Sequence, residues 1–313
     1  MSEPPPAPEA HPRRRGRRLR PAVAGLVLLV IAGYGAYYAV EHRPQRAGCT
    51  VAADGESLDL EPEQAANAST IAAVATSRSL PERALTIALA TSMQESMLRN
   101  LDHGDRDSLG LFQQRPSQGW GTPQQIMDPV HATNEFFDGL VKIDGYSRLP
   151  LTVAAQRVQK SGFPQAYAKH EADAALLTSA LTGRRPGALT CTLASDATVT
   201  TGDTAQVRKQ LAREFGPQVA PRPAEGRAGG GTARERTVQV PSTPAGGAAE
   251  GDGKRRGWEL AQWAVAHSAD LKVEKVSFRD KQWRAADSGG GWQKSDTSAA
   301  EKADGDVRIT VAQ

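Results

Sequence analysis

A run of twenty residues without a charge, Pro21 to Val40, constrains the organisation of this 313-residue chain more than any other feature. As a helix it would be about 30 Å long, the thickness of a hydrocarbon core. Arginines crowd its near side and tyrosines its far end, as at the two borders of a membrane span. We therefore expect a single-pass protein of the cell membrane, with a transmembrane helix at 21–40, a cytoplasmic N-terminus and an extracytoplasmic C-terminal region. A cleaved signal peptide is the alternative, but its apolar stretch would be unusually long and no Ala-x-Ala site lies near Tyr38.

Charge is divided unevenly along the chain. Residues 1–46 hold eight arginines and three glutamates of the 38 basic and 35 acidic residues in total, which leaves 30 and 32 for the rest. The basic surplus thus belongs to the tail that precedes and borders the expected span. The remainder gives no electrostatic reason to expect nucleic-acid binding.

Two cysteines, Cys49 and Cys191, both follow the expected span. In an oxidising compartment two thiols most simply form one disulfide, although free thiols or separate partners remain open. Such a bond would close a 143-residue loop and stabilise the fold by about 4–5 kcal/mol in the chain-entropy model. The cysteines also bracket a segment that reads as one domain.

Composition and periodicity predict five regions along the chain. We expect a mainly α fold with these parts: a basic cytoplasmic tail at 1–20, the transmembrane helix at 21–40, an all-α domain at 49–193, a flexible Gly/Pro/Ala-rich linker at 194–256, and a small α+β module at 257–313. In the module, helical spacing from Leu260 to Leu271 precedes alternating apolar residues around Val276 and Ile309.

The helix expected at 84–98 is apolar on almost every side as far as Ala90, which is typical of a helix buried at the centre of a domain. Glu95 lies where this helix runs out of apolar residues. Partial burial raises the pKa of a carboxyl group, and glycoside cleavage requires such an acid near neutral pH. From its position alone, a solvated or salt-bridged glutamate at a helix end is the more common explanation.

A second motif, Ser108 to Gln114, follows Glu95 by 13 to 19 residues. Together the two segments resemble the transglycosylase branch of the lysozyme-like superfamily, in which a helix ends in Glu-Ser and a polar loop leads to Gly-Leu-Met-Gln. Glu95-Ser96 and the stretch from Gly110 to Gln113 match both pieces in order, with Phe112 in place of Met. The resemblance covers residues 60 to 183. The family's Ala-Tyr-Asn-Ala-Gly helix is matched only loosely by residues 154–162, where the Tyr-Asn pair is absent. A further stretch, residues 110–121, is similar to uncharacterised bacterial envelope proteins.

The resemblance implies a site. Glu95 would be the general acid and base, with Tyr167 facing it as a second catalytic residue. The substrate-binding residues would be Ser96, Gly110, Gln113, Gln114, Trp120 and Gln159. It implies peptidoglycan glycan strands as the partner, with no cofactor and no metal. Three aspartates follow Glu95: Asp102, Asp105 and Asp107. They either supply a second carboxylate for hydrolysis or belong to a solvated turn. Their spacing does not match a calcium-binding loop.

Three function classes compete. The leading hypothesis is a membrane-anchored, peptidoglycan-cleaving enzyme, with transglycosylation favoured over hydrolysis. The second is an inactive lysozyme-like domain that binds glycan or scaffolds a cell-envelope complex, motivated by the missing Tyr-Asn pair. The third is a partner-binding protein acting through residues 257–313, which hold four of the five tryptophans. A small core that needs large side chains explains the same tryptophans.

Overall fold

The computed structural model describes residues 29–35, 37–38, 47–161, 165–194, 201–223, 236–243, 250–295 and 305–313. The chain divides into two units, Met1–Pro44 and Gln45–Gln313. In the first unit, residues 29–35, 37 and 38 are helical. Within the described ranges, no helix is both long and apolar enough to cross a membrane. The remainder of the expected span at 21–40 lies outside these ranges.

The second unit begins with a small antiparallel sheet of order β2-β1-β3. Its strands are β1 (Gly48–Ala53), β2 (Glu56–Leu60) and β3 (Leu189–Thr192). Cys49 lies directly opposite Cys191 in the register of β1 and β3, and the two form the expected disulfide. Two segments about 140 residues apart in sequence are thus tied together at the edge of the helical region.

Two long helices follow, α2 (Pro62–Ser77) and α3 (Glu82–Ser96). Each has a proline at or beside its first turn, where a missing N–H costs nothing. Every residue of α3 from Ala84 to Met93 is buried, so the prediction of a central helix is confirmed. The helix ends because Met97 takes the left-handed conformation, which leaves Glu95 in the last turn.

The other helices of this region pack around α3. They are α4 (Pro123–Ile126), α5 (Pro129–Val141), α6 (Leu151–Gln159) and α7 (Glu171–Leu181). Short 3-10 turns connect them: η2 (Pro116–Gln118), η3 (Tyr146–Arg148) and η4 (Ala168–His170). Phe136 on α5 stacks on Phe112 of the loop after α3, with ring centroids 4.7 Å apart. This contact fixes the loop that carries the second motif.

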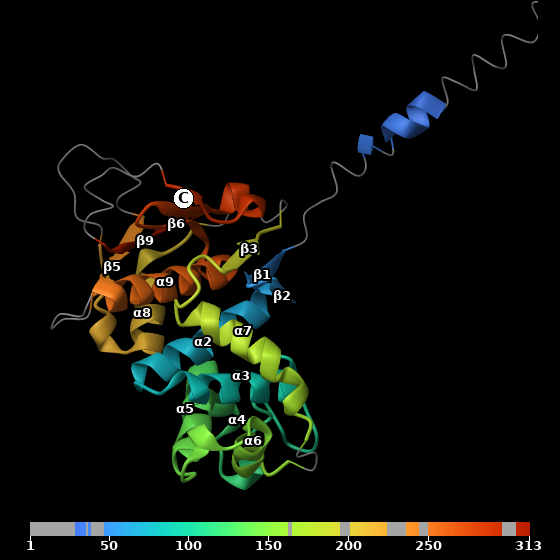
Figure 1. Cartoon of the computed structure of the whole chain (residues 1–313), viewed down its shortest axis with the longest axis vertical. Coiled ribbons are helices and arrows are strands. Elements are labelled where there is room, and N and C mark those ends of the chain that lie inside the picture. Colours follow the sequence, from blue (N-terminus) through green and yellow to red (C-terminus); the bar gives the residue numbers. More distant parts are fainter. Residues whose placement is uncertain are drawn as a thin grey trace, which may run out of the picture. The chain divides into compact units, whose positions relative to one another are not determined.

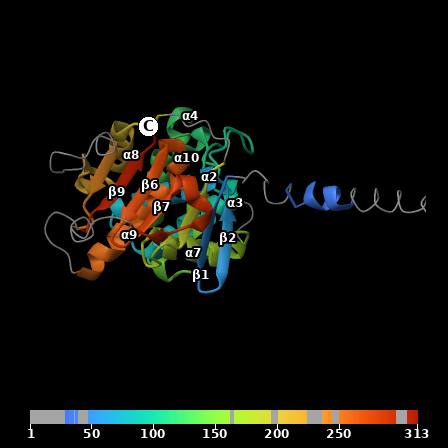
Figure 2. The same cartoon turned by 90° about the horizontal axis from the view of Figure 1, so that it is seen from above.

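A second, six-stranded antiparallel sheet has the order β4-β5-β9-β6-β7-β8. The strands are β4 (Arg222–Pro223), β5 (Thr237–Val240), β6 (Val273–Phe278), β7 (Lys281–Arg284), β8 (Gln293–Lys294) and β9 (Val307–Val311). The accompanying helices are α8 (Thr204–Phe215), η5 (Pro217–Val219), α9 (Glu250–Ala266), α10 (Ser268–Leu271) and η6 (Ala285–Gly290). Figure 2 shows β9, β6 and β7 side by side.

The helix α9 lies between this sheet and the helical region (Figure 1). Residues 257–268 are all buried, because α9 contacts β6 on one side and α2 and α7 on another. At Gly257 a Cβ atom would lie 2.1 Å from the Phe278 ring, so only glycine allows this close approach to the sheet. In the second unit, α8 and α9 therefore lie between the sheet and the helices α2 and α7, and α3, α5 and α6 lie beyond α9.

Side chains of the C-terminal half also cover the free edge of β3. The Trp283 and Trp292 indoles donate to the carbonyls of Cys191 and Leu189, at 3.1 and 2.9 Å. Gln262 accepts from the N–H of Leu189 at 2.9 Å. These bonds satisfy backbone groups that β1 leaves unpaired. The small sheet is thus completed by residues from beyond position 257.

A buried carboxylate, Glu214 on α8, joins the same layers. It accepts hydrogen bonds from the Trp263 indole at 2.6 Å and from the Thr70 hydroxyl on α2 at 3.0 Å, and His267 lies 3.6 Å away. Burial alone would raise the pKa of Glu214, but His267, Trp263 and Gln210 hold it below its ordinary value. The folded state therefore favours the ionised carboxylate.

The expectation of a mainly α fold with a transmembrane helix is wrong. The described residues form two antiparallel sheets in a mixed α+β architecture, and no helix among them can span a membrane. The domain expected to be all-α contains β1, β2 and β3. The stretch expected as linker, 194–256, contributes α8, which the four-residue spacing of Val207, Leu211 and Phe215 predicts, and also the unexpected strands β4 and β5. β5 pairs with β9 in the sheet expected to be a separate module. The reason is that strand pairing distant in sequence is invisible to local composition.

Candidate functional site

The last turn of α3 and the segment before η4 meet at Glu95. The Tyr167 hydroxyl donates to Glu95 Oε1 at 2.7 Å, although the residues are 72 positions apart. Tyr167 is fully buried, whereas Glu95 keeps part of its surface exposed. The amide of Gln159, from the last turn of α6, also hydrogen-bonds the Glu95 carboxyl group. Three elements thus orient one acid.

The loop from Ser108 to Gln114 turns back on itself through a bridge between Leu109 and Gln114. Gly110 sits at φ +74°, and a Cβ there would lie 2.6 Å from the carbonyl oxygen of Ile126. Glycine is therefore required at this position. The loop is held against α3 because the Ser92 and Ser96 hydroxyls both donate to the carbonyl of Leu111. Ser96 consequently positions the loop.

A cavity of about 670 Å³ opens in front of Glu95. Its lining comes from the end of α3, the loop after it, and the C-terminus of α6. The lining residues are Glu95, Asp105, Arg106, Ser108, Gln113, Gln114, Arg115, Gln118, Trp120, Val158, Gln159, Lys160 and Ser161. The volume is in the range of pockets that take small molecules or short oligomers.

Two glutamines in this lining present fixed acceptors. The amide nitrogen of Gln114 donates to the Ala132 carbonyl at 3.0 Å, and that of Gln159 donates to the Phe112 carbonyl at 2.7 Å. Each bond fixes the amide orientation, since the flipped amide would set two oxygens against one another. The Oε1 atoms of both residues are buried, with no protein partner within the described ranges. A ligand that donates N–H or O–H groups would satisfy them.

The ionisation of Glu95 is set by opposing effects. Burial raises the pKa of Glu95 above its ordinary value, while the hydrogen bonds from Tyr167 and Gln159 act in the other direction. Burial and the neighbouring Glu95 raise the pKa of Tyr167, so its hydroxyl remains a donor. Glu95 can therefore hold a proton at a higher pH than a solvated glutamate and can release it without losing its partners.

The aspartates of the loop differ in their environments. Arg115 and Ser117 hold the pKa of Asp107 well below its ordinary value, with the Arg115 Nε atom 2.7 Å from the carboxylate. Asp102 is exposed and pairs with His103. Asp105 lines the cavity and is exposed. Asp105 is thus the one member of this aspartate cluster in the lining.

The structure brings most of the site residues predicted from sequence to one place. Glu95, Gln113, Gln114, Trp120 and Gln159 share the cavity. Three predicted residues lie outside the lining, and two of them are Ser96, bonded to Leu111, and Gly110, buried in its turn. Tyr167 lies outside it as well and reaches the site through its bond to Glu95.

Sequence reasoning missed several lining residues, the most consequential being Arg106, Arg115 and Lys160. The sequence contains only a weak signal for these three residues. Arg115 lies in the stretch 110–121 that is similar to bacterial envelope proteins, whereas Lys160 lines the cavity from the end of α6, where it takes the left-handed conformation.

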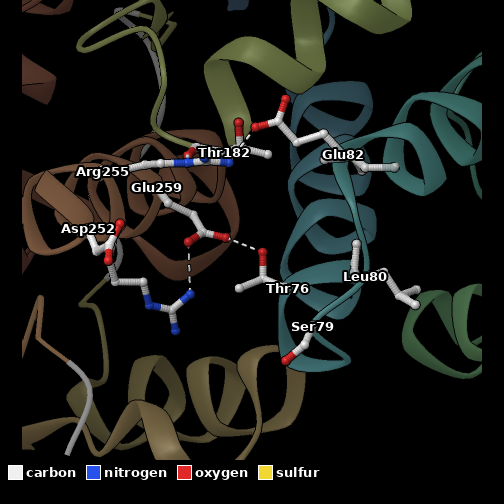
Figure 3. Close-up of a pocket in the computed structure, with 11 residues that line it drawn as sticks. Thr76, Ser79, Leu80, Glu82, Thr182, Asp252, Arg255 and Glu259 are labelled. Carbon is white, nitrogen blue, oxygen red and sulfur yellow. Dashed lines mark hydrogen bonds and ion pairs between the residues drawn. The ribbon is translucent and has the colours of Figure 1, made fainter. Parts of the chain in front are cut away.

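A second cavity, of about 370 Å³, lies where α9 meets α2 and α3 (Figure 3). Thr76 and Glu259 point toward one another across it, and Thr76 donates to Glu259. Glu82 pairs with Arg255 and Arg184. These charges hold helices together, so the cavity containing Glu95 is the better candidate site.

Comparison with known families gives one match. A family model described as "VldE, C-terminal domain" matches residues 196–304, which are 109 of the 313 residues. The matched segment runs from before α8 to beyond β8, so it is similar to that family across both the expected linker and the expected module. It contains neither Glu95 nor Tyr167. No curated protein matches the chain.

Proposed function

We propose that this protein cleaves peptidoglycan glycan strands, with Glu95 as general acid and then general base. The observation that carries the proposal is the Glu95–Tyr167 pair at the edge of a cavity, where burial raises the pKa of the acid. The order of Glu95-Ser96 and Gly110 to Gln113 supports it, because those motifs resemble transglycosylases of the lysozyme-like superfamily.

In the proposed reaction, protonated Glu95 donates to the oxygen that bridges two sugars as the bond to the anomeric carbon breaks. The 6-hydroxyl of the same N-acetylmuramoyl residue then attacks the anomeric carbon, and the Glu95 carboxylate takes the hydroxyl proton. Atoms and charge balance, and the acid is regenerated. Tyr167 and the Gln159 amide keep Glu95 oriented through both steps, since each donates to its carboxyl group.

We favour transglycosylation over hydrolysis because two of the three neighbouring aspartates are not placed to act as a second carboxylate. A hydrolase needs a second carboxylate to direct water or to capture the sugar. Asp107 is committed to Arg115 and Ser117, and Asp102 is outside the cavity lining. Asp105 is the one of the three in the lining, and it comes from an exposed part of the loop.

The glycan would be bound by polar acceptors and one aromatic ring. The free Oε1 atoms of Gln114 and Gln159 suit the acetamido N–H and hydroxyl groups of amino sugars. Trp120 offers a ring face, and its indole sits in the cavity wall. Gln113 is tied to the Gly110 and His103 carbonyls, both at 3.3 Å, so it contributes shape as much as polarity.

We also propose that residues 47–313 work outside the cytoplasm, where glycan strands lie. The Cys49–Cys191 disulfide supports this, because such bonds persist in oxidising compartments. The tryptophans of residues 257–313 favour a structural role there. Trp258, Trp263 and Trp283 are buried, and Trp292 packs on Trp258 with ring centroids 5.0 Å apart.

The experiment is release of soluble muropeptides from purified sacculi by the full chain. We expect release by wild type, loss of release in Glu95→Gln, and no change in Glu56→Gln, an exposed carboxylate on β2. Equal thermal unfolding of the three proteins would exclude misfolding as the cause. Sacculus binding without any release by wild type would favour the second candidate, an inactive glycan-binding domain, which the loosely matched third motif around Gln159 supports.

A further inference from the structure

Three cations line the cavity that contains Glu95: Arg106, Arg115 and Lys160. Arg115 is neutralised by Asp107, which accepts from its Nε atom at 2.7 Å. Arg106 and Lys160 come from different elements, the loop after α3 and the end of α6. No carboxylate pairs with either in the part of the chain that the structure describes.

This cationic surplus is local. Beyond residue 46 the chain has 30 basic and 32 acidic residues, so its general composition does not explain a positive cavity. Within the lining, Asp105 offsets one of the two free cations, and the raised pKa of Glu95 favours its neutral form. The cavity therefore attracts anions when the acid is protonated, which is the form that binds substrate in the proposed reaction.

Both cations also occupy positions where glycine would suit the backbone better. Arg106 has φ +57° and Lys160 has φ +52°, in the left-handed region that side chains with a Cβ disfavour. Lys160 is the C-cap of α6, where glycine is the usual residue. Replacement by glycine therefore removes the charge without a cost to the local conformation.

We infer that Arg106 and Lys160 form an anion subsite beside Glu95 that recognises a negatively charged substituent of the glycan strand. The substituent is a carboxylate of the attached peptide or a phosphate of an attached polymer. The subsite rests on the proposed function for the identity of the strand. The subsite favours glycan strands that carry such a substituent over strands that lack it, a preference that Glu95 and Tyr167 alone do not supply.

The test compares two matched double variants of the full chain. R106G/K160G removes the subsite charges. R279G/K272G removes the same residue types at φ +54° and +53°, at positions outside the cavity lining. Binding to sacculi by cosedimentation and release of muropeptides are measured separately, at low salt and at about 0.5 M salt, where charge interactions are screened within a few ångströms.

We expect about tenfold weaker binding of R106G/K160G at low salt, a difference that shrinks at high salt, and no change in R279G/K272G. The unfolding temperature of R106G/K160G should be unchanged or raised. Soluble glycan strands freed of peptides by an amidase should compete about tenfold less well than peptide-bearing strands for wild type if the anion is a carboxylate. Wild type should lose the same affinity on sacculi stripped of phosphate polymers if it is a phosphate. Equal binding by both double variants, or wild-type binding that neither treatment weakens, would overturn the subsite. Muropeptide release by wild type would leave the proposed function standing in that case, and failure of wild type to bind any sacculi would overturn both.

Discussion

Replacement of Glu214 by alanine tests whether the helical region and the C-terminal half fold as one unit. The substitution leaves the Trp263 indole and the Thr70 hydroxyl without their acceptor and leaves His267 without its carboxylate. Breaking a buried pair by removing one partner costs about 3–5 kcal/mol. For a unit of this size, that corresponds to a fall in the unfolding temperature of about 6–20 °C.

The effect has a defined pH dependence. The folded-state pKa of Glu214 is lowered, so its contribution is present above the unfolded value of about 4.3 and is lost as pH falls through the folded value. The difference between wild type and Glu214→Ala should therefore be full near neutral pH and shrink in acid. The control is Glu274→Ala, which removes a half-exposed partner of Arg236 and should cost less than about 1 kcal/mol.

The assay is thermal unfolding followed by circular dichroism and by tryptophan fluorescence. Fluorescence reports mainly on residues 257–313, where four of the five tryptophans lie, and circular dichroism reports on all helices. One coincident transition that moves down in Glu214→Ala is expected. Two separate transitions, or a loss no larger than in Glu274→Ala, would refute the single-unit interpretation.

Three further substitutions, with one control, address the site. Tyr167→Phe removes a donor that lowers the pKa of Glu95, so that pKa should rise and the pH profile of cleavage should move to higher pH. Gln114→Leu should weaken glycan binding about threefold to tenfold in cosedimentation, because one neutral hydrogen bond to the ligand is lost. Gln156→Leu, which removes a similarly unpartnered oxygen on α6 outside the cavity lining, should not weaken it. Gly110→Ala should lower stability by roughly 1–3 kcal/mol in denaturant unfolding, and an unchanged midpoint would contradict the strain assigned there.

Local pattern was sufficient for the features that depend on neighbours in sequence. The apolar run before Glu95 predicted a buried central helix, and the cysteine count predicted the Cys49–Cys191 bond. The spacing from Leu260 to Leu271 and the alternation in β6 and β9 likewise match the structure. In each case the signal is a periodicity or a residue count, which needs no knowledge of tertiary contacts.

The β-structure outside those segments could not be predicted in this way. β5 is four residues long in a stretch rich in glycine, alanine and proline, and its partner β9 lies about 70 residues further along. Its burial depends on pairing with β9 and β4 and on contact with α8, all of which lie elsewhere in the sequence. Composition therefore favoured a linker where the chain builds one side of a sheet.

The residues of the candidate site likewise divide into those that local sequence predicts and those whose position depends on the folded backbone. The motif order predicts Glu95 as the acid, and the 2.7 Å bond from Tyr167 is consistent with the expectation that Tyr167 faces it. The role of Ser96 differs because its hydroxyl turns toward Leu111. Arg106 and Lys160 could not be predicted as cavity residues from the sequence. Both have a left-handed backbone conformation, which sequence reasoning expects mainly at glycine.

The claim that Glu95 drives glycan cleavage is tested most directly by analysing the products of sacculi digested in isotopically labelled water. Wild type should yield anhydro sugar ends that carry no label, and Glu95→Gln should yield no new ends at all. Labelled reducing ends would show hydrolysis in place of transglycosylation. Cleavage by Glu95→Gln at the wild-type rate would contradict the role assigned to Glu95.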